Sequence, residues 1–453
     1  AFSNLYLKYF CNLTFQSQTF ERFFYNKTNN KMNEDILQYI WNYKKFRNFD
    51  FISTDGRKIE ILEFGEWNKN SGPDFLFAKI KIDDIIFAGN IEIHTKASDW
   101  FFHNHSGNPE FGNLILHAVY INDCNIPELE QHNIPTLELK NYIDEELIQK
   151  HQNLKAEHSF IACEELFDKN KIPLFFEETV LLKKLEAKSQ IFQESLSNNQ
   201  NNYEAVLFQN LVYTFGLKVN AEIFLQMAES LDFSVIQKIK QNHVHLEALF
   251  FGICGFLDHP SDEKMQVWKR EFDFLNVKFN LSDFKIHPKF SKLRPPNFPT
   301  VRLSQLANLY HSQPNLFSKL IEAKTIEDLY KIFKNVKASE YWDNRFNFGK
   351  ISTVESKKYL SQDFIDLIII NTILPMKYFY HKNHNPEIVD VIFDFYKQMK
   401  PEKNSVLDEW KQLGMKFENA LETQAFLYQY KLFCNHKKCL NCSVGFQLLK
   451  TED

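Results

Sequence analysis

Four ionisable side chains in the first quarter of the chain are of types that carry metal-dependent chemistry. Asp74 follows the turn Ser71-Gly72-Pro73, and Glu92, His94 and Lys96 occupy alternate positions of the segment GNIEIHTK. Alternate residues of a β-strand point to one side of a sheet, so these last three would share a face. Two carboxylates there can hold a divalent cation, and an imidazole or ammonium beside them can orient or deprotonate water. We therefore expect Asp74 and Glu92 to bind Mg²⁺ or Mn²⁺, with His94 or Lys96 acting on the attacking water.

Histidines gather in the same region and support a second interpretation. They are His94, His103, His105 and His117. Three imidazoles with Glu92 form a ligand set for zinc or iron, which would make the region a histidine-ligated hydrolase. His103 and His105, in the segment HNHSGNPEF, could also contact a metal or a substrate phosphate. Loop histidines are also typical of a polar structural role.

A second group of metal-binding residue types lies near the C-terminus, in CNHKKCLNC. The group consists of Cys434, His436, Cys439 and Cys442. Three thiols and an imidazole at this spacing are typical of a compact tetrahedral zinc site. The three thiols with a distant Cys163 or Cys254 could instead hold an iron–sulfur cluster. We expect structural zinc, and the alternative is a set of reduced thiols packed at a helix end.

The first group needs a sheet to position it, and the sequence predicts one after a short helix. Helical spacing of apolar residues begins after Asn33, a suitable N-cap, with acids in the first turn. Four β-rich runs follow, which are KIEILEF at 58–64, FLFAKIKI at 75–82, IIFAGNIEIH at 85–94 and NLILHAVYI at 113–121. A hairpin through Asp83-Asp84 would bring the Glu92 face beside the start of the preceding strand, where Asp74 lies.

Beyond about residue 175 the chain changes character. Glycine becomes rare, and long segments show the three-to-four spacing of helices. Four prolines between 286 and 300 interrupt this pattern and predict an ordered loop. We therefore expect an α/β core at 32–157, a helical region at 175–433 and a Cys-rich tip at 434–445. We expect residues 1–31 to be a non-native or disordered extension.

Charge is distributed unevenly and indicates where a polyanion would bind. Residues 32–157 hold 12 basic and 21 acidic side chains, a net of −9, whereas residues 278–324 hold eight basic and two acidic ones, a net of +6. Arginines beside a helix start suit phosphate. We expect Lys292, Arg294 and Arg302 to contact nucleic-acid backbone. The alternative is a solvated basic loop whose arginines pair with acids.

The composition also bears on location. The longest apolar runs, 248–257 and 367–374, are far shorter than the ~18 residues of a membrane span. Seven cysteines, an odd number scattered along the chain, do not form the pattern of a secreted disulfide framework. We expect a soluble cytoplasmic protein with no membrane partner.

The order of these elements resembles the PD-(D/E)xK nuclease superfamily. That superfamily has a helix carrying an acid, then Pro-Asp, then acid-x-Lys on the following strand, then a helix and a further strand. Pro73-Asp74 and Glu92-Ile93-His94 fit this order, with His94 where the superfamily has lysine, and Lys96 lies two residues further on. The resemblance implies that Glu34 is the helical acid and that the reaction is phosphodiester hydrolysis.

The chain also resembles, over nearly its whole length, an uncharacterised family found mainly in Bacteroidetes-type bacteria and known only as a domain of unknown function. The resembling segments include SGPDF, GNIEIHTKASDW, RPPNFPTVRLSQLA and CLNCSVG. The expected fold is α+β, with a restriction-endonuclease-like mixed sheet and flanking helices followed by a mainly α-helical region. The expected function is a metal-dependent nuclease acting on DNA or RNA. The alternatives are an inactive nucleic-acid or protein interaction module of the same fold, and the Zn or Fe hydrolase.

Overall fold

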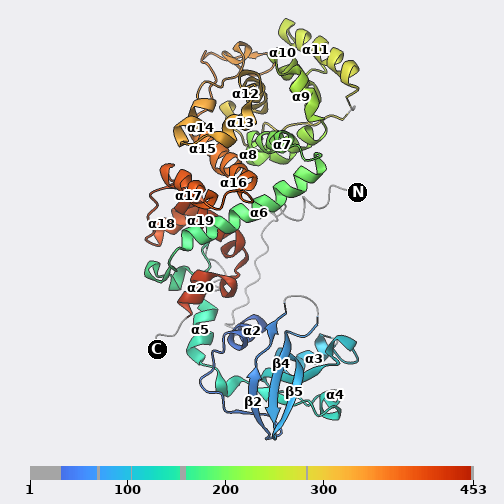
Figure 1. Cartoon of the computed structure of the whole chain (residues 1–453), viewed down its shortest axis with the longest axis vertical. Coiled ribbons are helices and arrows are strands. Elements are labelled where there is room, and N and C mark those ends of the chain that lie inside the picture. The colour runs from blue at the N-terminus through green and yellow to red at the C-terminus, as the bar shows by residue number, and fades with distance from the viewer. Residues whose placement is uncertain (1–31, 69–71, 104, 154–159, 282–283, 450–453) are drawn as a thin grey trace, which may run out of the picture. The chain divides into compact units, whose positions relative to one another are not determined.

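The computed structural model describes residues 32–449, apart from 69–71, 104, 154–159 and 282–283. The chain divides into two compact units, which meet in the sequence between residues 152 and 153 (Figure 1). The extension expected at residues 1–31 lies outside the described residues.

A seven-stranded sheet forms the centre of the first unit. Its strands are β1 (Phe51–Ile52), β2 (Lys58–Glu63), β3 (Glu66–Trp67), β4 (Phe75–Ile82), β5 (Ile85–Lys96), β6 (Leu114–Ile121) and β7 (Thr136–Glu138). They are ordered β1-β2-β4-β5-β6-β7, and β3 pairs with β4. The strands up to β5 pair antiparallel, whereas β5 with β6 and β6 with β7 pair parallel. The predicted α+β class is confirmed, and so is each of the four predicted strands.

Helices precede and follow these strands in the sequence. They are α2 (Glu34–Asn42), α3 (Asp99–Phe102), α4 (Pro127–Gln131) and α5 (Glu145–Asn153). Of these, α2 and α3 pack on β5. The predicted cap of α2 is confirmed, because Asn33 Oδ1 accepts a hydrogen bond from the Ile36 amide at 3.2 Å. The buried Trp41 of α2 contacts the Phe75 ring and donates from Nε1 to the Phe64 carbonyl at 2.9 Å. These contacts fix α2 beside the start of β4, where Asp74 lies.

Irregularities in β4 and β5 lie next to the predicted site. The β4–β5 register shifts between Phe75 and Ala78, with Phe77 at φ 59° and its side chain exposed. The β5–β6 register shifts between Asn90 and Ile91. Such bulges re-aim side chains and are frequent beside functional sites. Gly89 permits the close approach of β6, since a Cβ there would lie 2.4 Å from the Asn113 carbonyl oxygen.

The second unit is helical and is built around one large apolar core. Its helices of ten or more residues are α6 (Phe176–Asn198), α7 (Tyr203–Phe215), α8 (Leu217–Glu229), α10 (His243–Ile253), α11 (Glu263–Phe279), α12 (Pro299–Ser312), α17 (Ile388–Gln398) and α19 (Ala420–Leu432). The shorter ones are α9 (Phe233–Ile239), α13 (Leu316–Glu322), α14 (Ile326–Phe333), α15 (Gln362–Ile368), α16 (Leu374–His381), α18 (Ser405–Gln412) and α20 (Ser443–Leu448). A short hairpin pairs β8 (Arg345–Asn347) with β9 (Lys350–Ile351).

The predicted helical segments are confirmed, and α6 is the long helix along which α16 and α19 pack (Figure 1). The proline-rich loop at 286–300 ends in the 3₁₀ turn η5 (Pro295–Asn297). Among the helices of the described residues, none combines the length and the apolar surface needed for a membrane span.

Candidate metal centre

Asp74 and Glu92 are in direct contact in the first unit. The Asp74 amide donates to Glu92 Oε2 at 3.0 Å, and the Ile93 amide donates to Asp74 Oδ2 at 3.0 Å. Gln38 Nε2, from helix α2, donates to Asp74 Oδ1 at 2.7 Å. The β4–β5 hairpin thus brings the two carboxylates together, and α2 orients one of them.

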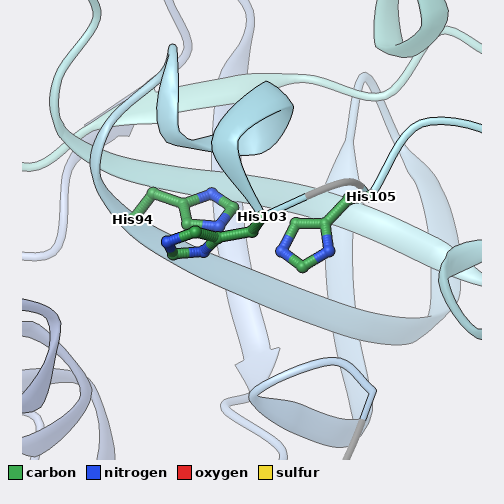
Figure 2. A group of neighbouring side chains, drawn as sticks. All are labelled: His94, His103 and His105. Atoms are coloured by element: carbon green, nitrogen blue, oxygen red, sulfur yellow. The ribbon is translucent and has the colours of Figure 1, made fainter.

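Two histidines face the remaining oxygen of Glu92. Glu92 Oε1 lies 3.4 Å from His94 Nε2 and 3.2 Å from His105 Nε2. His103 joins them, since one ring nitrogen from each of the three histidines lies within 4.8 Å of the others. Figure 2 shows the three rings gathered in one place, with His94 on strand β5 and the other two on the segment after α3. His103 Nδ1 also lies 3.9 Å from Glu34 Oε1.

These residues form one group, which we call the acid–histidine cluster. Its members are Glu34, Asp74, Glu92, His94, His103 and His105. The group runs from the buried interior to the surface, because the His94 side chain is fully buried and that of His103 is 42% exposed. Solvent therefore reaches the cluster from the side of His103 and Glu34.

An apolar anchor holds the histidine segment in place. Trp100 of α3 is buried and packs with Phe111 and Val119. Its indole Nε1 donates to Ser106 Oγ at 3.1 Å, and its carbonyl accepts from the His105 amide at 3.2 Å. The His105 ring lies against Phe111, with ring centres 4.0 Å apart. The backbone and the ring of His105 are therefore both held in place.

His117 of β6 supports His94 from behind. His94 Nδ1 and His117 Nε2 are 2.8 Å apart in a buried hydrogen bond. When His94 Nδ1 donates, its Nε2 carries a lone pair directed toward Glu92. A second group that fixes the tautomer in this way is typical of metal-ligating histidines. Nε2 of His94 and of His105 are both buried without a hydrogen-bond partner among the described residues.

Burial shifts the pKa values of the cluster strongly. It raises the pKa of Glu92 to about 8 and that of Asp74 to about 7, where the Glu92 charge adds to the effect. Burial also raises the pKa of Glu34 to about 7, although His103 opposes this. Burial, with neighbouring imidazoles, lowers the pKa of His94 to about 2. A buried set of acids that resist ionisation and imidazoles that resist protonation is the electrostatic environment that a bound cation would relieve.

The donor set fits a divalent ion. Two ligand atoms held at about 2.1 Å from one ion are about 3.0 Å apart in octahedral geometry and about 3.4 Å apart in tetrahedral geometry. The two distances from Glu92 Oε1 to the histidine nitrogens, 3.2 and 3.4 Å, lie in this range. Carboxylate and imidazole together suit Mn²⁺, Fe²⁺ or Zn²⁺ better than Mg²⁺, which prefers oxygen ligands and water.

The environments of Lys96 and His94 bear on their expected role in activating water. Lys96 is exposed at the end of β5. His94 is buried with a pKa far below neutrality, so it is a poor proton acceptor. The imidazole of His94 is placed to be a ligand instead. Glu34, with a pKa of about 7 at the solvent-facing side, is the better placed group for proton transfer.

The expected phosphate-binding residues belong to the second unit and differ among themselves. Lys292 and Arg294 are exposed. Arg302 lies inside α12 and is buried, with its guanidinium 3.5 Å from the centre of the Phe364 ring. Its Nη atoms donate to Gln305 and Asn297. The structure therefore gives Arg302 a role in packing rather than in binding a ligand from solvent.

The four expected zinc ligands near the C-terminus differ in their burial. Cys434, Cys439 and Cys442 are buried, whereas His436 is exposed. The imidazole of the expected zinc set therefore lies in a different environment from the three thiols.

A comparison with protein-family models gives a match over most of the chain. The model for a protein of unknown function, DUF2851, matches residues 34–405. The chain belongs to the DUF2851 family. No curated protein and no solved structure matches it. The DUF2851 match includes the whole acid–histidine cluster and the proline-rich loop, and it ends before the Cys-rich tip.

One residue of the candidate site in this DUF2851 chain was not anticipated from the sequence. Gln38 contacts Asp74 and lies one helical turn after Glu34 on α2. Residues four apart share a helix face, so the assignment of Glu34 to the site was the signal that could have found Gln38.

Proposed function

We propose that this protein is a metal-dependent phosphodiesterase of the nuclease type, with its divalent ion bound by Glu92, His94 and His105. The observation that carries the proposal is the position of Glu92 Oε1, 3.4 Å from one buried histidine nitrogen and 3.2 Å from another. Neither nitrogen has a hydrogen-bond partner among the described residues. Asp74 lies beside them and supplies a further carboxylate.

The choice of ion follows from the ligands. Of the two expected ions, Mg²⁺ and Mn²⁺, the second accepts imidazole more readily, and we propose Mn²⁺. Zn²⁺ or Fe²⁺ belongs to the competing interpretation of a histidine-ligated hydrolase, which the three clustered histidines favour. When bound, the ion would polarise a phosphoryl oxygen and lower the pKa of a water molecule.

The roles of the other residues follow from their positions in the cluster. Gln38 and the Ile93 amide hold the Asp74 carboxylate in one orientation. His117 fixes the ring of His94. At the solvent-facing side, Glu34 has a pKa near neutrality and lies beside His103, so it can accept or return a proton. His103 is exposed enough to contact a substrate phosphate.

Phosphodiester chemistry is proposed because of the order of the elements around the cluster. Helix α2 carries Glu34, Asp74 precedes β4, and Glu92 and His94 lie on β5. Helix α3 and the parallel strand β6 follow. This order is the one that the PD-(D/E)xK resemblance implies, and it supports a restriction-endonuclease-like arrangement for residues 32–157.

Nucleic acid is the proposed substrate, in the cytoplasm. The net charge of +6 over residues 278–324 supports this, with Lys292 and Arg294 exposed to contact phosphate. In this proposal the helical region at 175–433 and its loop at 286–300 hold nucleic-acid backbone. The competing proposal is an interaction module of the same fold that binds a partner without cleaving it.

A cleavage assay with matched variants tests the proposal. The full chain is incubated with labelled single- and double-stranded DNA and RNA, with Mn²⁺, Mg²⁺, Zn²⁺, Fe²⁺ or chelator. We expect cleavage with Mn²⁺, none with chelator, and a loss of about 100-fold or more in Glu92→Gln. Glu60→Gln, an exposed acid on β2, is the control that keeps full activity. Equal cleavage by wild type and Glu92→Gln contradicts the assignment, and binding without cleavage favours the interaction module.

A further inference from the structure

Four buried cysteines of the second unit lie in two segments that pack together, although one segment is far from the other in the sequence. Cys163 precedes the 3₁₀ turn η3 (Glu164–Leu166), and the other three belong to the C-terminal tip. We call Cys163, Cys434, Cys439 and Cys442 the cysteine cluster. Their exposed fractions are 6%, 8%, 6% and 7%, so all four thiols are buried.

Packing around the cluster joins the beginning of the second unit to its end. The ring of Phe160, three residues before Cys163, stacks on Tyr430 of α19 with ring centres 5.0 Å apart. Helix α20 packs against the 3₁₀ turn η4 (Lys169–Lys171). These contacts carry the segment of Cys163 to the tip.

The thiols also act on one another electrostatically. Burial raises the pKa of Cys434, and the charges of Cys442, Cys163 and Cys439 raise it further. Burial raises the pKa of Cys163 to about 12, and Cys439 and Cys442 add to this effect. Burial therefore disfavours free thiolates in this part of the protein, and a bound cation would reverse that preference.

Two N–H groups lie at the sulfur of Cys442. Gln429 Nε2 lies 2.6 Å from Cys442 Sγ, and the Gly445 amide donates to the same atom at 3.4 Å. Gly445 is packed tightly on the tip, since a Cβ there would lie 2.2 Å from the Cys439 carbonyl oxygen. N–H donors to sulfur stabilise a thiolate and tune metal sites.

We propose that the cysteine cluster is a four-thiolate site for a thiophilic metal, either a zinc ion or an iron–sulfur cluster. Cys163 takes the place that the sequence assigned to His436, because His436 is exposed while Cys163 is buried with the other three thiols. On binding, the thiols release their protons to solvent as the sulfur–metal bonds form. The site is structural, since four protein ligands leave no open position.

The two ligand sets make opposite predictions, which a pair of variants separates. The full chain, purified under reducing conditions, is analysed for zinc and iron, and its absorbance is recorded for the sulfur-to-iron band. We expect about one zinc, or an iron–sulfur cluster, per chain in the wild type. Cys163→Ser should lose that metal, whereas His436→Ala should retain it. Zinc without a sulfur-to-iron band identifies the single ion, and iron with the band identifies the cluster.

Cys124→Ser is the matched control, because Cys124 is a cysteine of the first unit that is only partly buried. It should bind as much metal as the wild type. A second measurement covers the case in which Cys163→Ser fails to fold. Chelator should lower the melting temperature of the wild type and of His436→Ala, and it should make four additional thiols react with an alkylating reagent. A wild type without metal, retention of metal in Cys163→Ser, or loss of metal in His436→Ala would each overturn the proposal.

Discussion

Glu92 and His105 come from different elements, and their side chains meet at 3.2 Å in the interior of the first unit. Glu92 lies on strand β5, and His105 follows helix α3. Burial raises the pKa of Glu92 and lowers that of His105, so both side chains are driven toward their neutral forms. A divalent cation between them would favour the ionised carboxylate of Glu92. It would also accept the lone pair of the neutral His105 imidazole as a ligand.

Replacement of His105 should weaken metal binding, whereas replacement of Lys96 should not. His105→Ala removes a ring nitrogen that faces Glu92, and we expect metal affinity to fall by about 100-fold. Lys96 is exposed at the end of β5, so Lys96→Ala should keep the affinity of the wild type. Calorimetric titration with Mn²⁺ measures both. Equal affinities in the two variants would argue against the ligand role of His105.

Glu92 and Asp74 should make the metal-free protein less stable as the pH rises from about 6.5 to about 8. Folded Glu92 and Asp74 hold their protons up to pH values of about 8 and about 7, whereas the unfolded chain releases them near pH 4. At these two carboxyls the folded state therefore binds more protons in this window, and their contribution to stability declines with increasing pH. The lowered pKa values of His94 and His117, caused mainly by burial, act in the opposite direction but only below pH about 6.5.

The expected loss in this window is on the order of 2 kcal/mol. Denaturant unfolding of wild type and Glu92→Gln at several pH values measures it, and the comparison removes the opposite effect of Lys184 and Lys188, whose pKa values burial lowers to about 7 and about 8. Saturating metal should abolish the loss, because the cation replaces the protons, and Glu92→Gln should reduce it. A difference in stability between wild type and Glu92→Gln that stays constant from pH 6.5 to 8 would contradict the raised pKa of Glu92.

Gln38 should act as a positioning residue for Asp74. Its amide donates to Asp74 Oδ1 and opposes the rise in the pKa of that carboxyl. Gln38→Met removes the donor at similar volume, so the pH at which metal binding reaches half its maximum should move upward, and affinity at pH 7 should fall by about tenfold. Gln131→Met, an exposed change on α4, is the control. An unchanged pH profile in Gln38→Met would leave Gln38 with only a structural role.

Gly89 should be required for the pairing of β5 with β6. In Gly89→Ala the new Cβ would lie 2.4 Å from the Asn113 carbonyl oxygen, so the strands must separate, at a cost of about 1–3 kcal/mol. Gly112→Ala is the matched control, because Gly112 has φ −66° and its nearest neighbour would be at 3.2 Å. Thermal unfolding compares the two variants. Equal melting temperatures would contradict the tight approach of the strands.

Local patterns predicted the elements of the first unit well. Alternating apolar residues identified β2, β4, β5 and β6, and Asn33 marked the start of α2. These features depend on neighbours in the sequence, which is why they can be read from it. The hairpin at Asp83-Asp84 then placed Asp74 beside Glu92 by strand alternation alone.

Burial and long-range contacts could not be predicted from local sequence patterns. Strand alternation placed Lys96 on the face of Glu92, but Lys96 lies at the end of β5, where the chain reaches solvent. Arg302 appeared to be a free cation at a helix start, yet α12 begins at Pro299 and the guanidinium packs on Phe364. The nearness of Cys163 to the C-terminal tip depends on tertiary packing, which no local spacing encodes.

Binding of Mn²⁺ to the full chain tests the central claim most directly. The paramagnetic resonance signal of free Mn²⁺ is followed while the ion is added to wild type, Glu92→Gln and the exposed control Glu60→Gln. Thiolates bind Mn²⁺ poorly, so the cysteine cluster does not interfere. The account predicts about one tightly bound ion per chain in wild type and Glu60→Gln, and a loss of about 100-fold in affinity in Glu92→Gln. Binding of the ion with equal affinity in all three proteins, or in none, would contradict it.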